Sequence, residues 1–358
     1  MDKRRITIAG AGISGLTAAI NLAKEGYEVA VFEKGKTVGT RFNNDFQGLE
    51  NWSTREDILS ILKRINIKSD FFYEAFREAD LINDKLEKHT IKSGGGRAGT
   101  YIVKRGSDED SLDKSLEKQA VNLGVQIEFG TRVEEREVDV VAMGPTFASG
   151  MVYGVKGEVE KGNQISIMLD NDCAPKGYVY MAIIEGRVTL ASVVMQDLNH
   201  CKNYFEKALA KMERLYGVRL ANPKFFSGFG NFRLLNSFSE GGRLYAGERA
   251  GFQDFLFGFG MRYAFLSGYL VAQSISKNLS YDSLIQDELI PSMKSSLVNR
   301  YVYEKLGNKG YRKLVKKWAA AEDPIKFLQQ WYQFGRLKRV LYPLSYRWHK
   351  KRGMPFRI

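Results

Sequence analysis

The first 33 residues alternate apolar segments with a glycine turn in the order strand, helix, strand. An apolar run at 6–9 ends in Gly10-Ala-Gly-Ile-Ser-Gly15, a helical pattern follows at 16–26, and a second apolar run covers 28–32. Short apolar runs bounded by glycine are typical of buried strands, and the longer segment between them has a helical period. The sequence therefore predicts a βαβ unit with two parallel strands at the amino-terminal end.

The pattern beyond residue 33 predicts strands and helices in separate groups. Polar and apolar residues alternate from 153 to 194 as in strands, whereas 111–120, 199–217 and 261–276 have a helical period. Shorter apolar runs at 125–129, 138–143 and 243–246 predict further strands. We expect four parts: a nucleotide-binding part at 1–150 with a helical insertion at about 50–95, a β-rich substrate domain at 151–240, a return to the first part at 241–280, and a helical, basic module at 281–358.

The residues of the glycine turn predict a dinucleotide site. Gly10 permits a tight turn, Gly12 lets the backbone approach a pyrophosphate, and Gly15 allows close packing of helix and strand. Glu33 ends the second strand, where a carboxylate accepts hydrogen bonds from ribose hydroxyls and repels a 2′-phosphate. The expected ligand is therefore FAD or NAD, and the lack of further βα units after Glu33 argues against an NAD dehydrogenase.

Length and composition are those of a folded protein of two or three domains: 358 residues, 44% hydrophobic and 27% charged. No apolar run reaches the roughly 20 residues of a membrane span, and the amino-terminal segment does not match a signal peptide. The expected compartment is the cytoplasm. Two cysteines, Cys173 and Cys201, and three scattered histidines argue against a disulfide framework and against a metal site.

The net charge of +13 is concentrated at the carboxyl-terminal end. Residues 305–358 hold 15 basic and two acidic residues, so this segment carries the whole excess, together with ten aromatic residues. Such a segment suits an anionic membrane surface or an acidic protein, with nucleic acid the least favoured partner. Packing of the aromatic side chains on the body of the protein is the alternative.

Five sequence blocks between about residues 4 and 275 resemble the FAD-dependent oxidoreductases of the p-hydroxybenzoate hydroxylase fold, and most closely the geranylgeranyl reductase group. The blocks are the fingerprint 10–33, the segment 101–105 with the following Ser111-Leu-Asp, the strand 139–144, the segment 174–180, and the pair 247–251 and 258–260. Met143 replaces the threonine, Glu248 the aspartate and Phe255 the proline that are usual in this family, and Phe259 stands inside the last glycine loop.

The resemblance implies a fold, a cofactor and a set of contacts. The expected fold class is α/β, with a Rossmann-like FAD-binding domain of the glutathione reductase / p-hydroxybenzoate hydroxylase type, an inserted antiparallel-sheet substrate domain and a helical carboxyl-terminal module. The expected cofactor is FAD. The residues expected to bind it are Gly10, Gly12, Ile13, Ser14, Gly15, Glu33, Lys34, Arg41, Arg105, Gly144, Gly247, Glu248, Gly258, Phe259, Gly260 and Met261.

The resemblance favours reduction of carbon–carbon double bonds in an isoprenoid or another apolar lipid, with hydride from reduced flavin. Tyr178 and Tyr180 are the expected catalytic residues, and Cys173 is either a weak acid in the same pocket or a buried structural thiol. Monooxygenation of an apolar or aromatic substrate and a non-catalytic flavin-binding scaffold remain alternatives, and halogenation is disfavoured. The electron donor is expected to be NAD(P)H or a ferredoxin, and the basic tail leaves attachment to the periphery of a membrane open.

Overall fold

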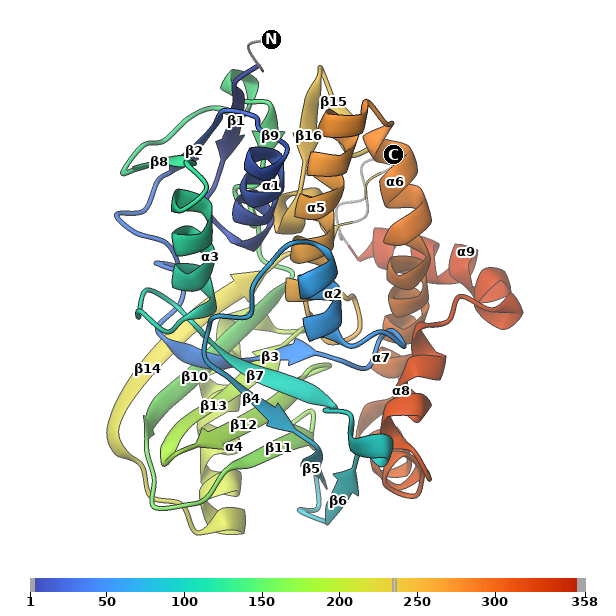
Figure 1. Cartoon of the computed structure of the whole chain (residues 1–358). Coiled ribbons are helices and arrows are strands. Elements are labelled where there is room, and N and C mark those ends of the chain that lie inside the picture. The colour runs from blue at the N-terminus through green and yellow to red at the C-terminus, as the bar shows by residue number, and fades with distance from the viewer. Residues whose placement is uncertain (1–3, 234, 236, 353–358) are drawn as a thin grey trace.

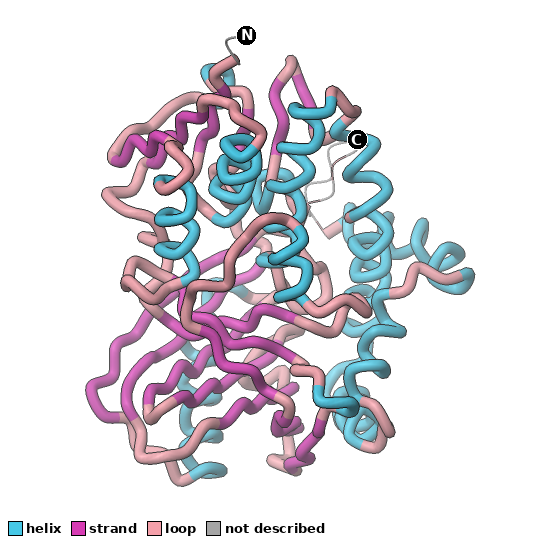
Figure 2. The backbone as a smooth tube through the Cα atoms, in the orientation of Figure 1, coloured by secondary structure: helices cyan, strands magenta, loops and turns pink. Residues whose placement is uncertain are grey.

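The computed structural model describes residues 4–233, 235 and 237–352. Figure 1 shows two layers of sheet, one above the other, with a column of helices along one side. The strands of the lower layer are long, as Figure 2 shows, and the orange-to-red colour of the column in Figure 1 marks it as the carboxyl-terminal part of the described chain. The amino-terminal βαβ unit forms the centre of the upper layer.

The upper layer is a six-stranded sheet in the order β15-β16-β9-β1-β2-β8. Its strands are β1 (Ile6–Ala9), β2 (Val29–Glu33), β8 (Gln126–Phe129), β9 (Val140–Val141), β15 (Ser239–Glu240) and β16 (Arg243–Tyr245). All neighbours are parallel except β15 and β16. Helices α1 (Ile13–Lys24), α3 (Leu112–Val121) and α5 (Met261–Lys277) pack side by side on it. The predicted βαβ unit and the predicted return of the chain to this sheet are therefore present.

The lower layer is a seven-stranded sheet in the order β14-β10-β13-β12-β11-β5-β6. Its strands are β5 (Glu78–Asn83), β6 (Lys88–Lys92), β10 (Gly150–Glu158), β11 (Gln164–Leu169), β12 (Tyr178–Ile184), β13 (Arg187–Val194) and β14 (Ala221–Gly230). Helix α4 (Cys201–Tyr216) packs on β10 and β13. A three-stranded sheet of β3 (Asp45–Glu50), β7 (Thr100–Arg105) and β4 (Tyr73–Phe76) lies between the two layers (Figure 1).

The segment 50–95 differs from the helical insertion that the sequence predicts. It contains a single short α-helix, α2 (Ile58–Arg64), and the strands β4, β5 and β6. Strand β6 alternates exposed and half-buried residues, and β5 is paired in parallel with β11, so this segment completes the substrate sheet. A two-residue period is the signature of a half-buried strand, and the pairing partner lies more than 80 residues away along the chain.

The helical column consists of α6 (Tyr281–Glu288), α7 (Ile290–Ala319), α8 (Pro324–Tyr332) and α9 (Arg336–Lys351). The expected helical tail is confirmed over its described residues. Gly307 interrupts α7 with a φ of 59°, and residues on both sides of it bury aromatic side chains against the substrate sheet. The buried side chains include Tyr303, Tyr311, Trp318 and Tyr332. The tail is therefore part of the core, not a detached module.

Short 3₁₀ turns complete the described structure: η1 (Gly94–Gly96), η2 (Glu135–Glu137), η3 (Leu198–His200) and η4 (Gly247–Ala250). None of the helices in the described part of the chain is both long enough and apolar enough to span a bilayer.

Candidate functional site

A cavity of about 660 Å³ lies at the carboxyl ends of β1, β2 and β9, between the two layers of sheet. This is the edge at which ligands bind in open parallel sheets, and the volume is in the range of small-molecule and cofactor sites. The predicted cofactor-binding and catalytic residues all line this cavity, except Gly15 and Gly247. The structure therefore brings together residues from five separate sequence blocks.

The glycine turn forms one end of the cavity. Gly10 has a φ of 104°, and a Cβ on it would lie 2.4 Å from the carbonyl oxygen of Ala142. A Cβ on Gly15 would lie 2.0 Å from the carbonyl oxygen of Gly10, because helix and strand approach closely there. Gly12, the N-cap of α1, has no atom within 4 Å of an added Cβ. The open space at Gly12 and the unpaired N–H groups of a helix start fit a pyrophosphate.

Glu33 closes the turn through its carboxylate. Oε2 accepts a hydrogen bond from the backbone N–H of Ala11 at 2.9 Å, and Oε1 accepts one from Gly35 at 2.7 Å. A carboxylate has about four acceptor positions, so both oxygens keep capacity for ribose hydroxyls. Glu33 thus orients the loop that carries Gly12 and faces the cavity at the same time.

The two arginines of the cavity are held by acidic partners. Arg41 Nη1 donates to Glu248 Oε2 at 2.6 Å, and its Nη2 donates to the carbonyl of Phe229. Arg105 is buried and donates two hydrogen bonds of 2.8 Å to Asp113, with its guanidinium stacked 4.1 Å from the ring centre of Phe42. Arg105 therefore has a structural role in addition to its place on the cavity wall.

Glu248 also accepts a hydrogen bond from the backbone N–H of Asn231 at 3.0 Å. The longer side chain, in place of the aspartate usual in the resembling family, thus reaches both Arg41 and the end of β14. Gly247, beside it, packs so closely on Ser14 that an added Cβ would lie 2.4 Å from the hydroxyl. Gly247 therefore sets the approach of η4 to α1 without lining the cavity.

The loop before α5 is organised by Asp254, a residue that the sequence analysis did not single out. Its carboxylate accepts hydrogen bonds from the backbone N–H groups of Leu256 at 3.2 Å and Phe257 at 2.8 Å. Burial raises the pKa of Asp254 to about 6. The sequence signal was an acidic residue directly before the apolar run 255–257 and Gly258. This turn fixes the start of α5 against the cavity.

Four aromatic side chains form the far wall of the cavity. Tyr178 is stacked on Phe259 with 6.3 Å between ring centres and meets Phe257 edge to face at 5.6 Å. Trp52 meets Phe259 edge to face at 4.8 Å. Phe259 can lie there because Gly48 has no side chain: a Cβ on Gly48 would be 2.9 Å from its ring. Trp52 was missed by sequence reasoning, because the segment around it was expected to be helical.

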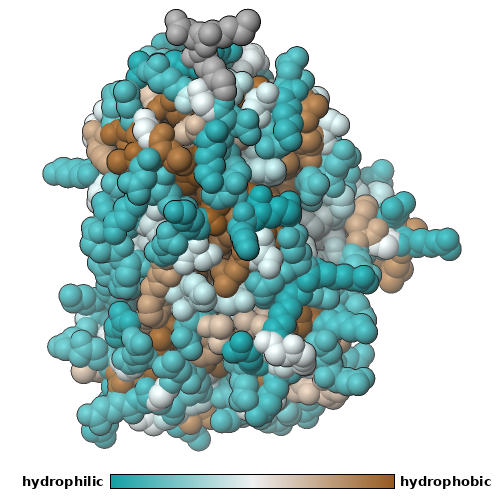
Figure 3. Space-filling model, in the orientation of Figure 1, coloured by the Kyte–Doolittle hydropathy of each residue, from teal (hydrophilic) through white to brown (hydrophobic). Residues whose placement is uncertain are grey.

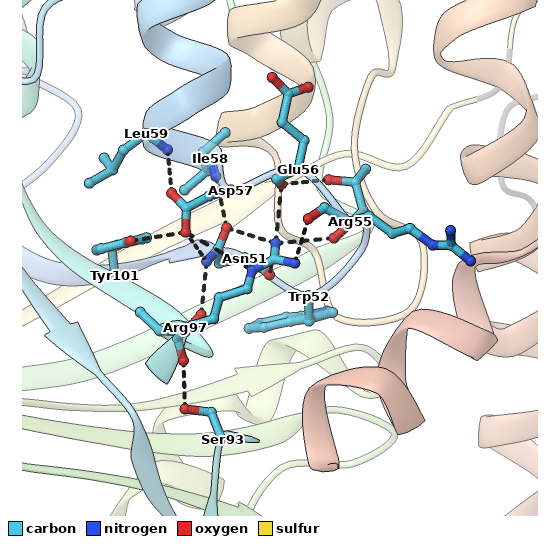
Figure 4. Close-up of polar contacts among 12 residues, drawn as sticks. Asn51, Trp52, Arg55, Glu56, Asp57, Ile58, Leu59, Ser93, Arg97 and Tyr101 are labelled. Atoms are coloured by element: carbon cyan, nitrogen blue, oxygen red, sulfur yellow. Dashed lines mark hydrogen bonds and ion pairs between the residues drawn. The ribbon is translucent and has the colours of Figure 1, made fainter. Parts of the chain in front are cut away.

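A polar network holds the loop that carries Trp52 (Figure 4). Arg97 donates to the carbonyl oxygens of Asn51 at 2.7 Å and Arg55 at 2.8 Å. The amide of Asn51 donates to Asp57 at 2.7 Å, and the hydroxyl of Tyr101 donates to the same carboxylate at 3.0 Å. These hydrogen bonds therefore hold in place the loop that positions Trp52 in the aromatic wall.

Tyr178 and Tyr180 lie side by side on β12, with 6.4 Å between ring centres. Burial raises the pKa of both phenols far above the ordinary value, so both stay protonated. The hydroxyl of Tyr180 donates to the carbonyl of Phe46 at 3.4 Å. Cys173 lines neither this cavity nor the chamber behind it, and burial raises the pKa of its thiol to about 12. Of its two sequence interpretations, the buried structural thiol fits the structure.

A second, smaller chamber of about 90 Å³ lies behind the aromatic wall. It shares Trp52, Tyr178, Phe257 and Phe259 with the first cavity. Its other walls come from the helical column and the β5–β6 hairpin, with the apolar side chains Ile91, Trp318, Ile325 and Leu328. The two chambers thus meet at the aromatic wall.

The sequence profile of the FAD dependent oxidoreductase family matches residues 5–163. The thiamine thiazole synthase of Pyrococcus abyssi is 26% identical over 192 residues, which are 49% of this chain and 75% of that protein. That of Pyrococcus furiosus is 33% identical over 110 residues, 30% of this chain and 42% of that protein. The alignment to the Pyrococcus furiosus protein therefore spans less than half of that protein's length.

Solved structures resemble the whole chain. A geranylgeranyl bacteriochlorophyll reductase-like protein of Thermoplasma acidophilum superposes with a TM-score of 0.71 at 15% identity, covering 98% of this chain and 99% of that one. A flavin-dependent brominase superposes with a TM-score of 0.66 at 13% identity over 98% and 100%. A probable FAD-dependent monooxygenase of Pseudomonas aeruginosa has a TM-score of 0.59 at 14% identity over 87% and 100%. At such identities these likenesses establish the fold.

Three observations support FAD as the cofactor: an open glycine turn with Glu33, a cavity between the sheets, and a matching family profile. Over residues 5–163 the chain carries the FAD-dependent oxidoreductase domain, and the chain has a fold of the glutathione reductase / p-hydroxybenzoate hydroxylase type.

Proposed function

We propose that the protein reduces a carbon–carbon double bond of an isoprenoid or a similar long apolar substrate. The observation that carries the proposal is the apolar chamber behind the aromatic wall, which meets the cofactor cavity at Tyr178, Phe257 and Phe259. An apolar chain of the substrate would occupy this chamber while its double bond lies in the larger cavity.

The residues around the double bond would exclude water and supply a proton. FAD, when bound and reduced, supplies hydride. Reduction of an alkene needs one hydride and one proton, so a donor must face the substrate. Tyr178 lines both chambers and is protonated, because burial raises its pKa, whereas Tyr180 lines the larger cavity alone. Tyr178 is therefore the proposed proton donor, and NAD(P)H or a ferredoxin is the proposed external source of electrons.

The test is anaerobic reoxidation of the flavin. We expect protein reduced with dithionite to be reoxidised by a polyprenyl lipid without oxygen, and the lipid to gain two hydrogen atoms by mass spectrometry. Reoxidation that requires oxygen and adds an oxygen atom to the lipid would establish the monooxygenase alternative. A flavin that reacts with no apolar substrate under either condition would favour the non-catalytic scaffold.

Three substitutions examine the assignment within the site. Tyr178→Phe is expected to lower turnover by about a hundredfold, the contribution of one positioned acid, with FAD still bound. Tyr180→Phe is the matched control on the same strand and is expected to change turnover far less. Leu328→Trp, which narrows the second chamber, should lower the turnover of long chains relative to short ones.

A further inference from the structure

Helix α9 exposes a ridge of apolar side chains. Leu337, Val340 and Leu344 are 72%, 76% and 52% exposed, and the first two are the most exposed large apolar side chains in the described part of the chain. Their spacing of three and four residues puts them on one face of the helix. Figure 3 shows brown side chains gathered on the projection at the right, where Figure 1 places α9.

The ridge faces outward because the opposite side of α9 is anchored. Ser345 and His349 are buried and lie within hydrogen-bond distance of the carbonyl of Leu297 on α7, at 3.0 and 3.2 Å. Lys338 donates to Ser295 at 2.6 Å and to the carbonyl of Trp331. These contacts fix the rotation of the helix, so Leu337, Val340 and Leu344 cannot turn inward without breaking them.

The charge of α9 has a single sign. The helix contains no acidic residue, and its exposed positions include five basic ones: Arg336, Arg339, Arg347, Lys350 and Lys351. By contrast, the aromatic residues of the tail are mostly buried or half-buried, Trp318, Tyr332, Tyr342 and Trp348 among them. An exposed aliphatic ridge beside basic side chains is the pattern of a helix that lies in the plane of a membrane surface.

We propose that α9 docks the protein on an anionic lipid bilayer, with Leu337, Val340 and Leu344 inserted at the boundary of headgroups and acyl chains. The basic residues beside the ridge contact the anionic headgroups. A nucleic acid or an acidic protein would satisfy the charge and leave the aliphatic ridge in water. Helix α8, which walls the apolar chamber, leads into α9 through residues 333–335, so docking would bring that chamber close to the lipid.

Vesicle flotation of the full-length, FAD-loaded protein tests this. We expect binding to vesicles of phosphatidylcholine mixed with phosphatidylserine, and none to phosphatidylcholine alone. Binding should weaken steeply between about 0.1 and 1 M salt, where the Debye length falls from about 10 to about 3 Å. The triple variant L337S/V340S/L344S should bind at least tenfold more weakly.

The matched control is V121S/L123S/L279S, which removes three exposed apolar side chains elsewhere and should bind as the wild type does. An unchanged near-ultraviolet circular dichroism spectrum and unchanged flavin content show that each variant is folded. Failure of the wild type to bind the anionic vesicles at low salt overturns the proposal, as does full binding of the α9 variant. Binding of the protein to polyglutamate without binding to the anionic vesicles also overturns the proposal. Flotation does not depend on turnover, so membrane docking is tested independently of the proposed reaction.

Discussion

The three glycines of the turn differ in what an added Cβ atom would contact, and this difference separates a role in cofactor binding from a role in folding. A Cβ added to Gly10 or to Gly15 would lie 2.4 or 2.0 Å from a backbone oxygen. A Cβ added to Gly12 would have no protein atom within 4 Å. A side chain at Gly12 would therefore meet the cofactor and nothing of the protein. A side chain at Gly15 would push α1 away from β1.

We expect Gly12→Val to fold normally and to purify with at least tenfold less FAD, because the side chain occupies the space of the pyrophosphate. Visible absorbance and urea unfolding measure the two effects. Gly15→Ala is the counterpart, and we expect it to lower the free energy of unfolding by about 2 kcal/mol through overpacking. Loss of stability in Gly12→Val equal to that in Gly15→Ala would contradict this division of roles.

The docking of α9 on α7 depends on a buried histidine. His349 is fully buried, and burial lowers its pKa from 6.5 to about 4. The charged groups that act on it are Glu304, Arg300 and Arg352. Glu304 raises the pKa of the ring and the two arginines, which both pair with Glu304, lower it, so burial is the main cause of the lowered pKa. A proton on His349 is therefore unfavourable while α9 is docked.

The folded protein consequently binds fewer protons at His349 than the unfolded chain does between about pH 6.5 and pH 4. The contribution of the neutral ring to stability is complete above pH 6.5 and is lost as the pH falls through this window. At about 1.4 kcal/mol per pKa unit, the loss is on the order of 3 kcal/mol. Urea unfolding at several pH values should show this decrease in the wild type and a smaller one in His349→Gln. Parallel pH profiles of the two proteins would exclude His349 as the cause.

One hydrophobic cluster joins the sheets to the carboxyl-terminal helices. Trp318, Ile325 and Leu328 pack with Trp52 and Phe257 of the cofactor side and with Leu81 of the substrate sheet. Arg300 of α7 also donates to the carbonyl oxygens of Leu256 at 3.0 Å and Lys176 at 2.6 Å. The basic tail therefore exposes the surface of α9 and also forms a wall of the apolar chamber.

We expect a chain that ends at residue 304 to lose its cooperative fold and its flavin. Each large buried side chain that is removed contributes about 3 to 5 kcal/mol, and the stability of a whole domain is only about 5 to 15 kcal/mol. Circular dichroism and flavin content of the soluble fraction give the readout. The full-length variant L337S/V340S/L344S, altered in the same tail but outside the core, is the control. A truncated protein that unfolds cooperatively and binds FAD would refute the shared core.

The cofactor half of the protein could be read from local patterns. The turn 10–15, Glu33 and the helices α1, α3 and α5 follow from glycine spacing and a helical period, and each of these signals is contained in a short stretch of sequence. FAD was predicted from the same residues together with the family resemblance. Trp52 was not predicted, since it owes its place to a contact with Phe259, which is distant in the chain. Asp254 was not predicted either, although its hydrogen bonds to Leu256 and Phe257 are local.

Long-range packing settled what these patterns left open. Strands β5 and β6 join the substrate sheet through a parallel pairing with β11, which no local period encodes. The sequence predicted a helical, basic tail and left open whether its aromatic side chains pack on the body. Only the folded structure shows that α7 and α8 bury apolar side chains whereas α9 exposes them. A sequence period specifies that a side of a helix is apolar, whereas the surface that covers it depends on residues hundreds of positions away.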